Sequence, residues 1–285
     1  MARYKKILSA IDGSESSMHA LRESFKFASN EKCWITVTSV VPRYDGDLDM
    51  VGIGNVMSSM RKPCENALKQ AEKLAKQEGV LIKTVCEEGE IFDRISDLAA
   101  AENCDLIVIG RRGLHRLERS LVGSVTARVI GYSQKDVLVV PGDTQVGFQR
   151  VLVATDGSKQ CGTAVERAIN FAGSYGGEIL VVSIVDVPAE FYAEAPQVVE
   201  GMVHKAQGYV EEVKKQAEAS GVKTETFVRE GEAYQAIIEI AKARDVNIIV
   251  MGSHGRTGLK RLLMGSVAEK VIRHGTKPIF LKRCT

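Results

Sequence analysis

The strongest constraint on the fold is an internal repeat in this 285-residue chain. Residues 110–125 read GRRGLHRLERSLVGSV, and residues 252–267 read GSHGRTGLKRLLMGSV. Both stretches keep two glycines near the start and a Gly-Ser pair near the end, and the corresponding residues lie 142 positions apart. Isolated glycine turns are common, but two of them with one spacing indicate two copies of a single folding unit.

The beginnings of the two copies also correspond. An apolar run at residues 5–11 ends in Asp-Gly-Ser at 12–14, and a run at 150–155 ends in the same triplet at 156–158, 144 positions later. Each run is typical of a buried parallel strand that leads into a helix. We expect the serine of each triplet to be the N-cap of that helix.

The copies diverge after their second strands, at residues 42–63 in the first and 186–201 in the second. The offset falls from 144 to 142 across these segments, so they contain the length difference between the copies. Variable segments on a repeated scaffold are natural places for specificity or partner contacts. An exposed linker without such a role explains them equally well.

In each copy, short apolar runs alternate with segments of helical periodicity in the order β-α-β-α-β-α-β-α-β. Such alternation predicts a parallel sheet with right-handed crossovers. We therefore expect an α/β protein of two tandem Rossmann-like domains, each a five-stranded parallel sheet with helices on both faces. The polar stretch 142–147 separates the copies, which predicts domains at residues 1–142 and 148–285.

The charge balance argues against nucleic acid or an anionic membrane as a partner, because 38 Lys+Arg and 36 Asp+Glu leave a formal net charge of only +2. No apolar run is long enough to span a bilayer, and the first residues lead directly into a strand rather than a signal peptide. The six cysteines are scattered without a C-x-x-C pair, which favours free thiols over a disulfide framework or a zinc site. We expect a cytoplasmic protein.

The repeated glycine stretch has the form of an anion site, because it joins a strand to the start of a helix. The amide groups at a helix N-terminus lack intrahelical partners, and the helix dipole favours negative charge there. Glycines at this position let the backbone approach a ligand closely. In doubly wound sheets, ligands bind beyond the carboxyl ends of the strands, where Asp12 and Asp156 are also expected.

Three features together resemble the universal stress protein family. They are the Asp-Gly-Ser after the first strand, the Ser-Val-Val or Ser-Ile-Val that ends the second, and Gly-x-x-Gly followed by nine residues and Gly-Ser. The resemblance covers nearly the whole chain twice and therefore implies a tandem universal stress protein. No Gly-Lys-Ser or Gly-Lys-Thr of a Walker A loop occurs.

The resemblance implies that the glycine motif holds the phosphates and ribose of ATP, or of ADP or AMP. The implied contacts in the second copy are Asp156, Ile184, Gly252, His254, Gly255, Gly265, Ser266 and Val267. Those in the first copy are Asp12, Val40, Gly110, Arg112, Gly113, Gly123, Ser124 and Val125.

Among these residues, Ile184 and Val40 would offer backbone groups to adenine, and Asp156 and Asp12 would lie near a bound Mg²⁺ ion. Without the resemblance, the two aspartates are explained as well by helix capping. The copies differ at two places. The first has Arg111-Arg112 where the second has Ser253-His254, and it has Asp136 where the second has Pro278. For this reason the second copy is the leading candidate for nucleotide binding.

No recognisable catalytic set accompanies the motif, although His254 and His115 lie in the glycine loops. The leading hypothesis is an adenine-nucleotide-binding stress-response protein that acts as a sensor with little or no catalysis. A slow ATPase and a protein-interaction scaffold without nucleotide are the alternatives. The resemblance also implies that the last strands, at residues 137–140 and 279–281, pair the copies as an intramolecular pseudo-dimer. A homodimer of chains and further protein partners stay open.

Overall fold

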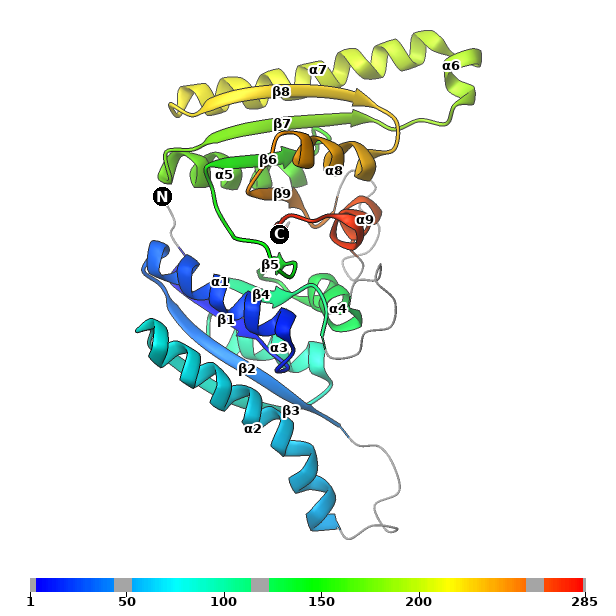
Figure 1. The fold of residues 1–285 in the computed structure, drawn as a ribbon. Helices are drawn as coiled ribbons and strands as arrows, with labels where there is room; N and C mark the ends of the chain where they lie inside the picture. Colours follow the sequence, from blue (N-terminus) through cyan, green and yellow to red (C-terminus); the bar gives the residue numbers. More distant parts are fainter. Residues whose placement is uncertain (1–3, 44–52, 114–122, 255–263, 284–285) are drawn as a thin grey trace. The chain divides into compact units, whose positions relative to one another are not determined.

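The computed structural model describes residues 4–43, 53–113, 123–254 and 264–283, and the side chains of these residues except 53–58, 159 and 160 (Figure 1). The chain divides into two compact units, Met1–Asp143 and Thr144–Thr285. None of the described helices is both long and apolar enough to cross a bilayer.

The first unit is a parallel sheet of five strands in the order β3-β2-β1-β4-β5. The strands are β1 (Lys6–Ala10), β2 (Trp34–Pro42), β3 (Ile82–Gly89), β4 (Leu106–Gly110) and β5 (Asp136–Val140). The helices that connect them are α1 (Glu15–Glu31), α2 (Ile53–Glu78), α3 (Ile91–Ala101) and α4 (Ser124–Tyr132).

The second unit repeats this topology with the strand order β8-β7-β6-β9-β10. Its strands are β6 (Arg150–Ala154), β7 (Glu178–Val185), β8 (Lys223–Glu230), β9 (Ile248–Gly252) and β10 (Ile279–Lys282). Its helices are α5 (Lys159–Ser174), α6 (Glu190–Glu194), α7 (Pro196–Ala219), α8 (Ala233–Ala243) and α9 (Ser266–His274).

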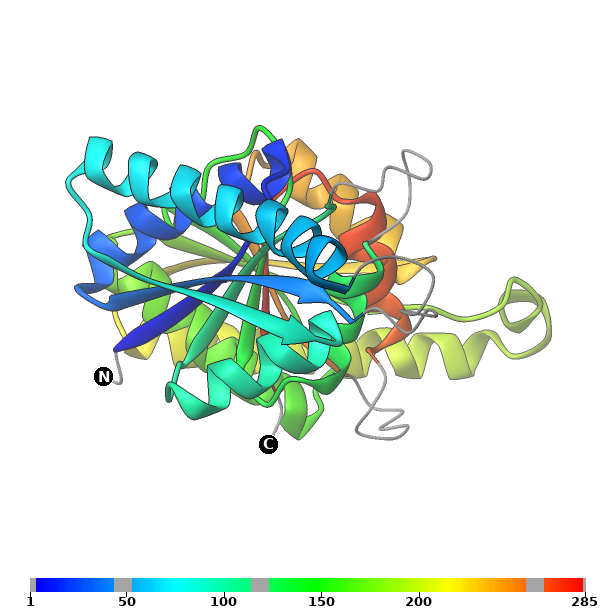
Figure 2. The same ribbon diagram turned by 90° about the horizontal axis from the view of Figure 1, so that it is seen from below.

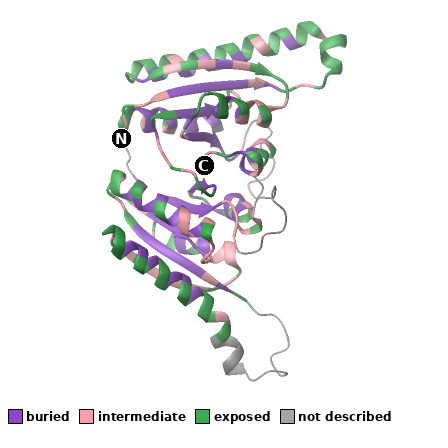
Figure 3. Cartoon of the chain, viewed as in Figure 1, coloured by how far each residue is buried: buried purple, intermediate pink, exposed green. Residues whose placement is uncertain are grey.

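Right-handed crossovers place the helices in two layers. In the first unit α1 contacts α2, and α3 contacts α4, so the pairs cover opposite faces of the sheet. The central strands are buried almost throughout, and the exposed residues gather on the outer faces of the helices (Figure 3). The predicted fold of two tandem five-stranded parallel sheets is confirmed.

The predicted caps also form. Ser14 accepts a hydrogen bond from the Ser17 amide at 3.2 Å at the start of α1, and Ser158 accepts one from the Cys161 amide at 3.3 Å at the start of α5. Satisfying these donors is what allows the chain to turn from β1 and β6 directly into helices.

The divergent segments contain more helix than the sequence predicts. Helix α2 begins at Ile53 and continues through Pro63, and α7 begins at Pro196, where proline occupies the first turn. A proline is tolerated in the first turn because its missing amide would have no intrahelical partner there. The short helix α6 lies inside the second divergent segment, which is therefore structured rather than an extended linker.

The difference between Asp136 of the first unit and Pro278 of the second has a structural reason. Asp136 is buried and accepts a hydrogen bond of 2.8 Å from the Tyr4 hydroxyl. At the corresponding positions of the second unit, the hydroxyl and the carboxylate are both absent, because Phe148 and Pro278 stand there. The ring contact is kept in both units, since Phe148 stacks on Phe171 with centroids 4.3 Å apart and Tyr4 packs edge-on against Phe27 at 5.5 Å.

The expectation that all cysteines are free thiols is wrong for one pair. Cys64 of α2 and Cys86 of β3 form a disulfide with a Cα–Cα distance of 6.3 Å. Cys33, Cys104 and Cys161 are free, and Cys284 lies outside the described residues. The disulfide ties α2 to the outer strand of the first sheet.

Reduction of this disulfide should destabilise the chain. The bond closes a loop of 22 residues, and loop-closure entropy assigns about 3 kcal/mol to a loop of that size. We expect dithiothreitol to lower the urea-unfolding midpoint of the wild-type protein.

The matched control is C64A/C86V, which carries the residues that the second unit has at the same positions, Ala206 and Val228. Its midpoint should not change with dithiothreitol. Equal midpoints of the wild type with and without the reductant would show that the bond does not stabilise the fold.

Candidate functional site

A cavity of about 330 Å³ lies at the carboxyl ends of the three neighbouring strands β7, β6 and β9. The strand order reverses between β6 and β9, which is the place where doubly wound sheets bind ligands. The volume is within the range of small-molecule sites. The cavity lies within the second unit.

The structure brings seven of the eight residues proposed for the second copy to this one cavity. They are Asp156, Ile184, Gly252, His254, Gly265, Ser266 and Val267. The eighth, Gly255, lies outside the described residues, as do His115 and most of both glycine loops.

Main-chain hydrogen bonds join the two ends of the glycine loop. The Gly265 amide donates to the Ser253 carbonyl at 3.0 Å, which brings the start of α9 back to the end of β9. Gly265 is the N-cap of α9, and glycine has no side chain that could accept from the first-turn amides. Ser266 and Val267 therefore line the cavity with the helix N-terminus, which attracts anions.

The first-strand aspartates shape the turn before each helix and are not its cap. The Oδ1 atom of Asp156 accepts from the Ser158 amide at 2.9 Å, and Oδ1 of Asp12 accepts from the Ser14 amide at 3.0 Å. Because the serines are the N-caps, helix capping does not explain the aspartates. The Asp156 carboxylate lies on the wall of the cavity.

His254 has an unsatisfied ring nitrogen at the cavity. Its Nδ1 lies 3.1 Å from the Ser253 hydroxyl, and among the described residues its buried Nε2 has no hydrogen-bond partner. A buried polar atom without a partner is unfavourable, so a ligand that hydrogen-bonds to it gains affinity.

In the first unit, the corresponding residues lie close together. A Cβ atom on Gly113 would overlap the Asp12 carboxylate, and one on Gly110 would come 2.9 Å from the Ser16 carbonyl oxygen. The protein's own backbone thus requires glycine at position 110, and a side chain at position 113 would displace the Asp12 carboxylate. The Gly123 amide repeats the loop closure by donating to the Arg111 carbonyl at 3.1 Å.

The remaining proposed residues of the first unit occupy the positions of their counterparts. Val40 is half-buried near the end of β2, and Ser124 and Val125 begin α4. Burial, and then the neighbouring charge of Arg112, lowers the pKa of Arg111. Two adjacent cations therefore stand where the second unit has Ser253 and His254.

Several cavity residues were missed by sequence analysis. Thr155, Cys161, Asp186 and Met251 also line it, and the Oδ2 atom of Asp186 accepts from the Ala233 amide at 3.0 Å. Thr155, Asp186 and Met251 lie next to or near the ends of β6, β7 and β9, so the strand ends carried a signal for them, whereas Cys161 lies in α5. Within the described part of the chain, no three His, Cys, Asp or Glu side chains are grouped to hold a metal.

Comparison with family models matches the universal stress protein family at residues 3–141 and again at 147–283. The chain belongs to this family and carries its domain twice, so the resemblance seen in the sequence is confirmed. It is 36% identical over 140 residues to universal stress protein MJ0531 of Methanocaldococcus jannaschii, which covers 47% of this chain and 81% of that protein.

Two further similarities extend over both copies. A universal stress protein of Mycolicibacterium smegmatis is 25% identical over 293 residues, covering 97% of this chain and 96% of that protein. The crystal structure of a universal stress protein from Archaeoglobus fulgidus aligns with a TM-score of 0.76 at 23% identity, covering 98% of this chain and 96% of that one. The latter similarity is one of fold.

The thiol of Cys161 should react slowly at neutral pH. Burial raises its pKa to about 11, and only the thiolate is an effective nucleophile. At pH 8 roughly one thiol in a thousand is ionised, and the alkylation rate should rise about tenfold per pH unit up to pH 10. Iodoacetamide labelling followed by peptide mass spectrometry measures this rate.

Chain unfolded in urea is the control for the reagent's own pH dependence. Labelling of the folded protein at pH 8 as fast as that of the unfolded chain would contradict the burial of Cys161.

Proposed function

We propose that the protein binds an adenine nucleotide, with ATP as the leading ligand, in the cavity of the second unit. The observation that carries this proposal is the meeting of two anion-binding groups in one space. The N-terminus of α9, which follows Gly265, lines the cavity, and so does His254, whose buried Nε2 has no partner among the described residues. Phosphate groups match both.

The other residues that line the cavity fit a nucleotide whose phosphates lie at the start of α9. The phosphates would lie against the amides of Ser266 and Val267, with the glycine backbone of residue 252 close to the ribose. The carboxyl end of β7 at Ile184 would face the adenine edge. Asp156 is one carboxylate at the cavity, which suits a Mg²⁺ ion that takes most of its ligands from phosphate and water.

Binding rather than turnover is the proposed activity. Among the described cavity residues, no general base is paired with an orienting partner and a nucleophile in the way that hydrolysis requires. Occupancy of the site would instead order the glycine loop and change the surface that partners meet. Pairing of the last strands, a homodimer and a role for Asp12 in the first unit stay predictions.

A cytoplasmic location is also part of the proposal. Disulfides are rare in reducing compartments, so this proposal expects Cys64 and Cys86 to be reduced in the cell.

Gly265→Val should weaken ATP binding at least about tenfold, because a branched side chain would enter the space over the first turn of α9. Isothermal titration calorimetry of the full chain with ATP and Mg²⁺ measures the affinity. The matched control is Gly123→Val, the same change in the first unit, which should leave the affinity unchanged. If only the control variant lost ATP binding, the nucleotide site would be the one in the first unit.

His254→Ala should weaken ATP binding by roughly tenfold, since one hydrogen bond to a charged phosphate is removed. The control is Arg112→Ala, the corresponding residue of the first unit, which should have little effect. Adenosine, which lacks phosphate, should bind the wild type and His254→Ala equally. An equal loss of adenosine affinity would mean that the histidine does not contact the phosphates.

A further inference from the structure

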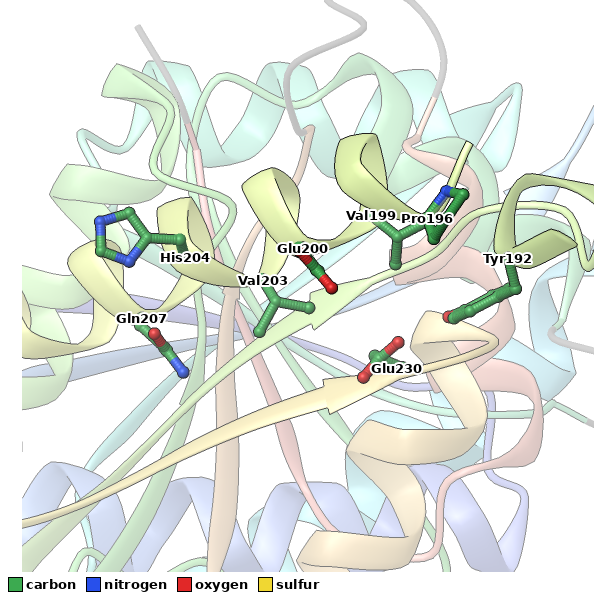
Figure 4. Close-up of a pocket in the computed structure, with 8 residues that line it drawn as sticks. All are labelled: Tyr192, Pro196, Val199, Glu200, Val203, His204, Gln207 and Glu230. Carbon is green, nitrogen blue, oxygen red and sulfur yellow. The ribbon is translucent and has the colours of Figure 1, made fainter. Parts of the chain in front are cut away.

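The second unit has another cavity, of about 460 Å³, which shares no residue with the candidate nucleotide site. It lies between α6, the first half of α7 and the end of β8, the outer strand of the sheet. We call it the α7 groove and define it by Tyr192, Pro196, Val199, Glu200, Val203 and Glu230. In Figure 4, Tyr192, Glu200 and Glu230 turn toward one another from three different elements.

The α7 groove has apolar side chains in its lining. Val199 is buried in its floor, and Tyr192 is 41% exposed beside it. Phe191, Val198 and Met202, from the same two helices, are also 40–50% exposed but do not line the groove. Figure 2 shows α6 and the start of α7 extending past the ends of the strands. Gathered apolar side chains of this kind mark interaction surfaces.

The α7 groove is also acidic. Glu200 of α7 lines it, and no lysine or arginine is among the described residues of its lining. Glu230 adds a carboxylate from β8. Partial desolvation, the neighbouring Glu230 carboxylate and the charge of Asp186 raise the pKa of Tyr192, as a negative potential should.

The fold that the two units share does not require all of the residues that line the α7 groove. At the positions of Val203 and His204 in α7, the first unit has Arg61 and Lys62, two exposed cations on α2. One copy is therefore basic at two positions where the other has valine and histidine. Most of the α7 groove belongs to the segment in which the copies diverge, and Glu230 at the end of β8 completes it.

We propose that the α7 groove binds a basic amphipathic segment of a partner protein. A lysine or arginine side chain would lie between Glu200 and Glu230 beside the Tyr192 ring, where carboxylates and an aromatic face both favour a cation. Apolar side chains of the same segment would cover Val199 and Val203. Among the described residues the acids are not grouped as metal ligands, so an organic cation fits them better than a metal ion.

Calorimetry of the full chain with a synthetic 18-residue amphipathic peptide of lysine and leucine tests the proposal at about 0.15 M salt. The wild type should bind this peptide and should not bind the same peptide with glutamate for lysine. E200Q/E230Q should weaken binding at least about tenfold, since two charge-assisted contacts are lost. The matched control E211Q/E218Q removes two exposed charges from the far part of α7 and should change the affinity less than about twofold.

V203R/H204K is the second variant, because it places the first unit's residues in the α7 groove and should abolish binding by charge repulsion. Circular dichroism and urea midpoints equal to those of the wild type would show that the variants fold. An equal loss in E200Q/E230Q and E211Q/E218Q, or undiminished binding by V203R/H204K, would overturn the proposal. So would a wild-type dimer in light scattering that E200Q/E230Q converts to a monomer, because the occupant would then be a second copy of the chain.

Discussion

The candidate site depends on one main-chain hydrogen bond, donated by the Gly265 amide to the Ser253 carbonyl. It holds the start of α9 against the end of β9 and so turns the first-turn amides toward the cavity. The first unit keeps the same bond between Gly123 and Arg111. Because the bond uses only backbone atoms, the neighbouring side chains are free to differ. This explains why the copies share their glycines yet present Ser-His in one unit and Arg-Arg in the other.

Local patterns predicted most of the fold. The strands, the serine caps and the glycine loops follow from periodicity and from groups a few residues apart, and these do not depend on tertiary contacts. The Cys64–Cys86 bond could not be found this way, because it needs the register of β3 beside β2 and the buried face of α2. In the site, Cys161 was missed because only the folded first turn of α5 brings it to the same wall as Asp156.

The two copies differ at contacts whose partners lie within one unit. Tyr4 and Asp136 form a buried hydrogen bond, and their counterparts Phe148 and Pro278 both lack the polar groups. The turn at Gly13 packs against Ala67 of α2, while the turn at Gly157 packs against the Tyr209 ring of α7. In each case the fold stays the same because both partners lie within one unit.

The pair of Tyr4 and Asp136 has a consequence for how such a chain can recombine. A crossover between the copies inside a unit would set Phe148 against Asp136 and leave a buried carboxylate without its hydroxyl donor, a loss of about 1–3 kcal/mol. A crossover in the polar stretch between the units keeps every such pair intact. Packing therefore disfavours any exchange between the copies that replaces Tyr4 without also replacing Asp136.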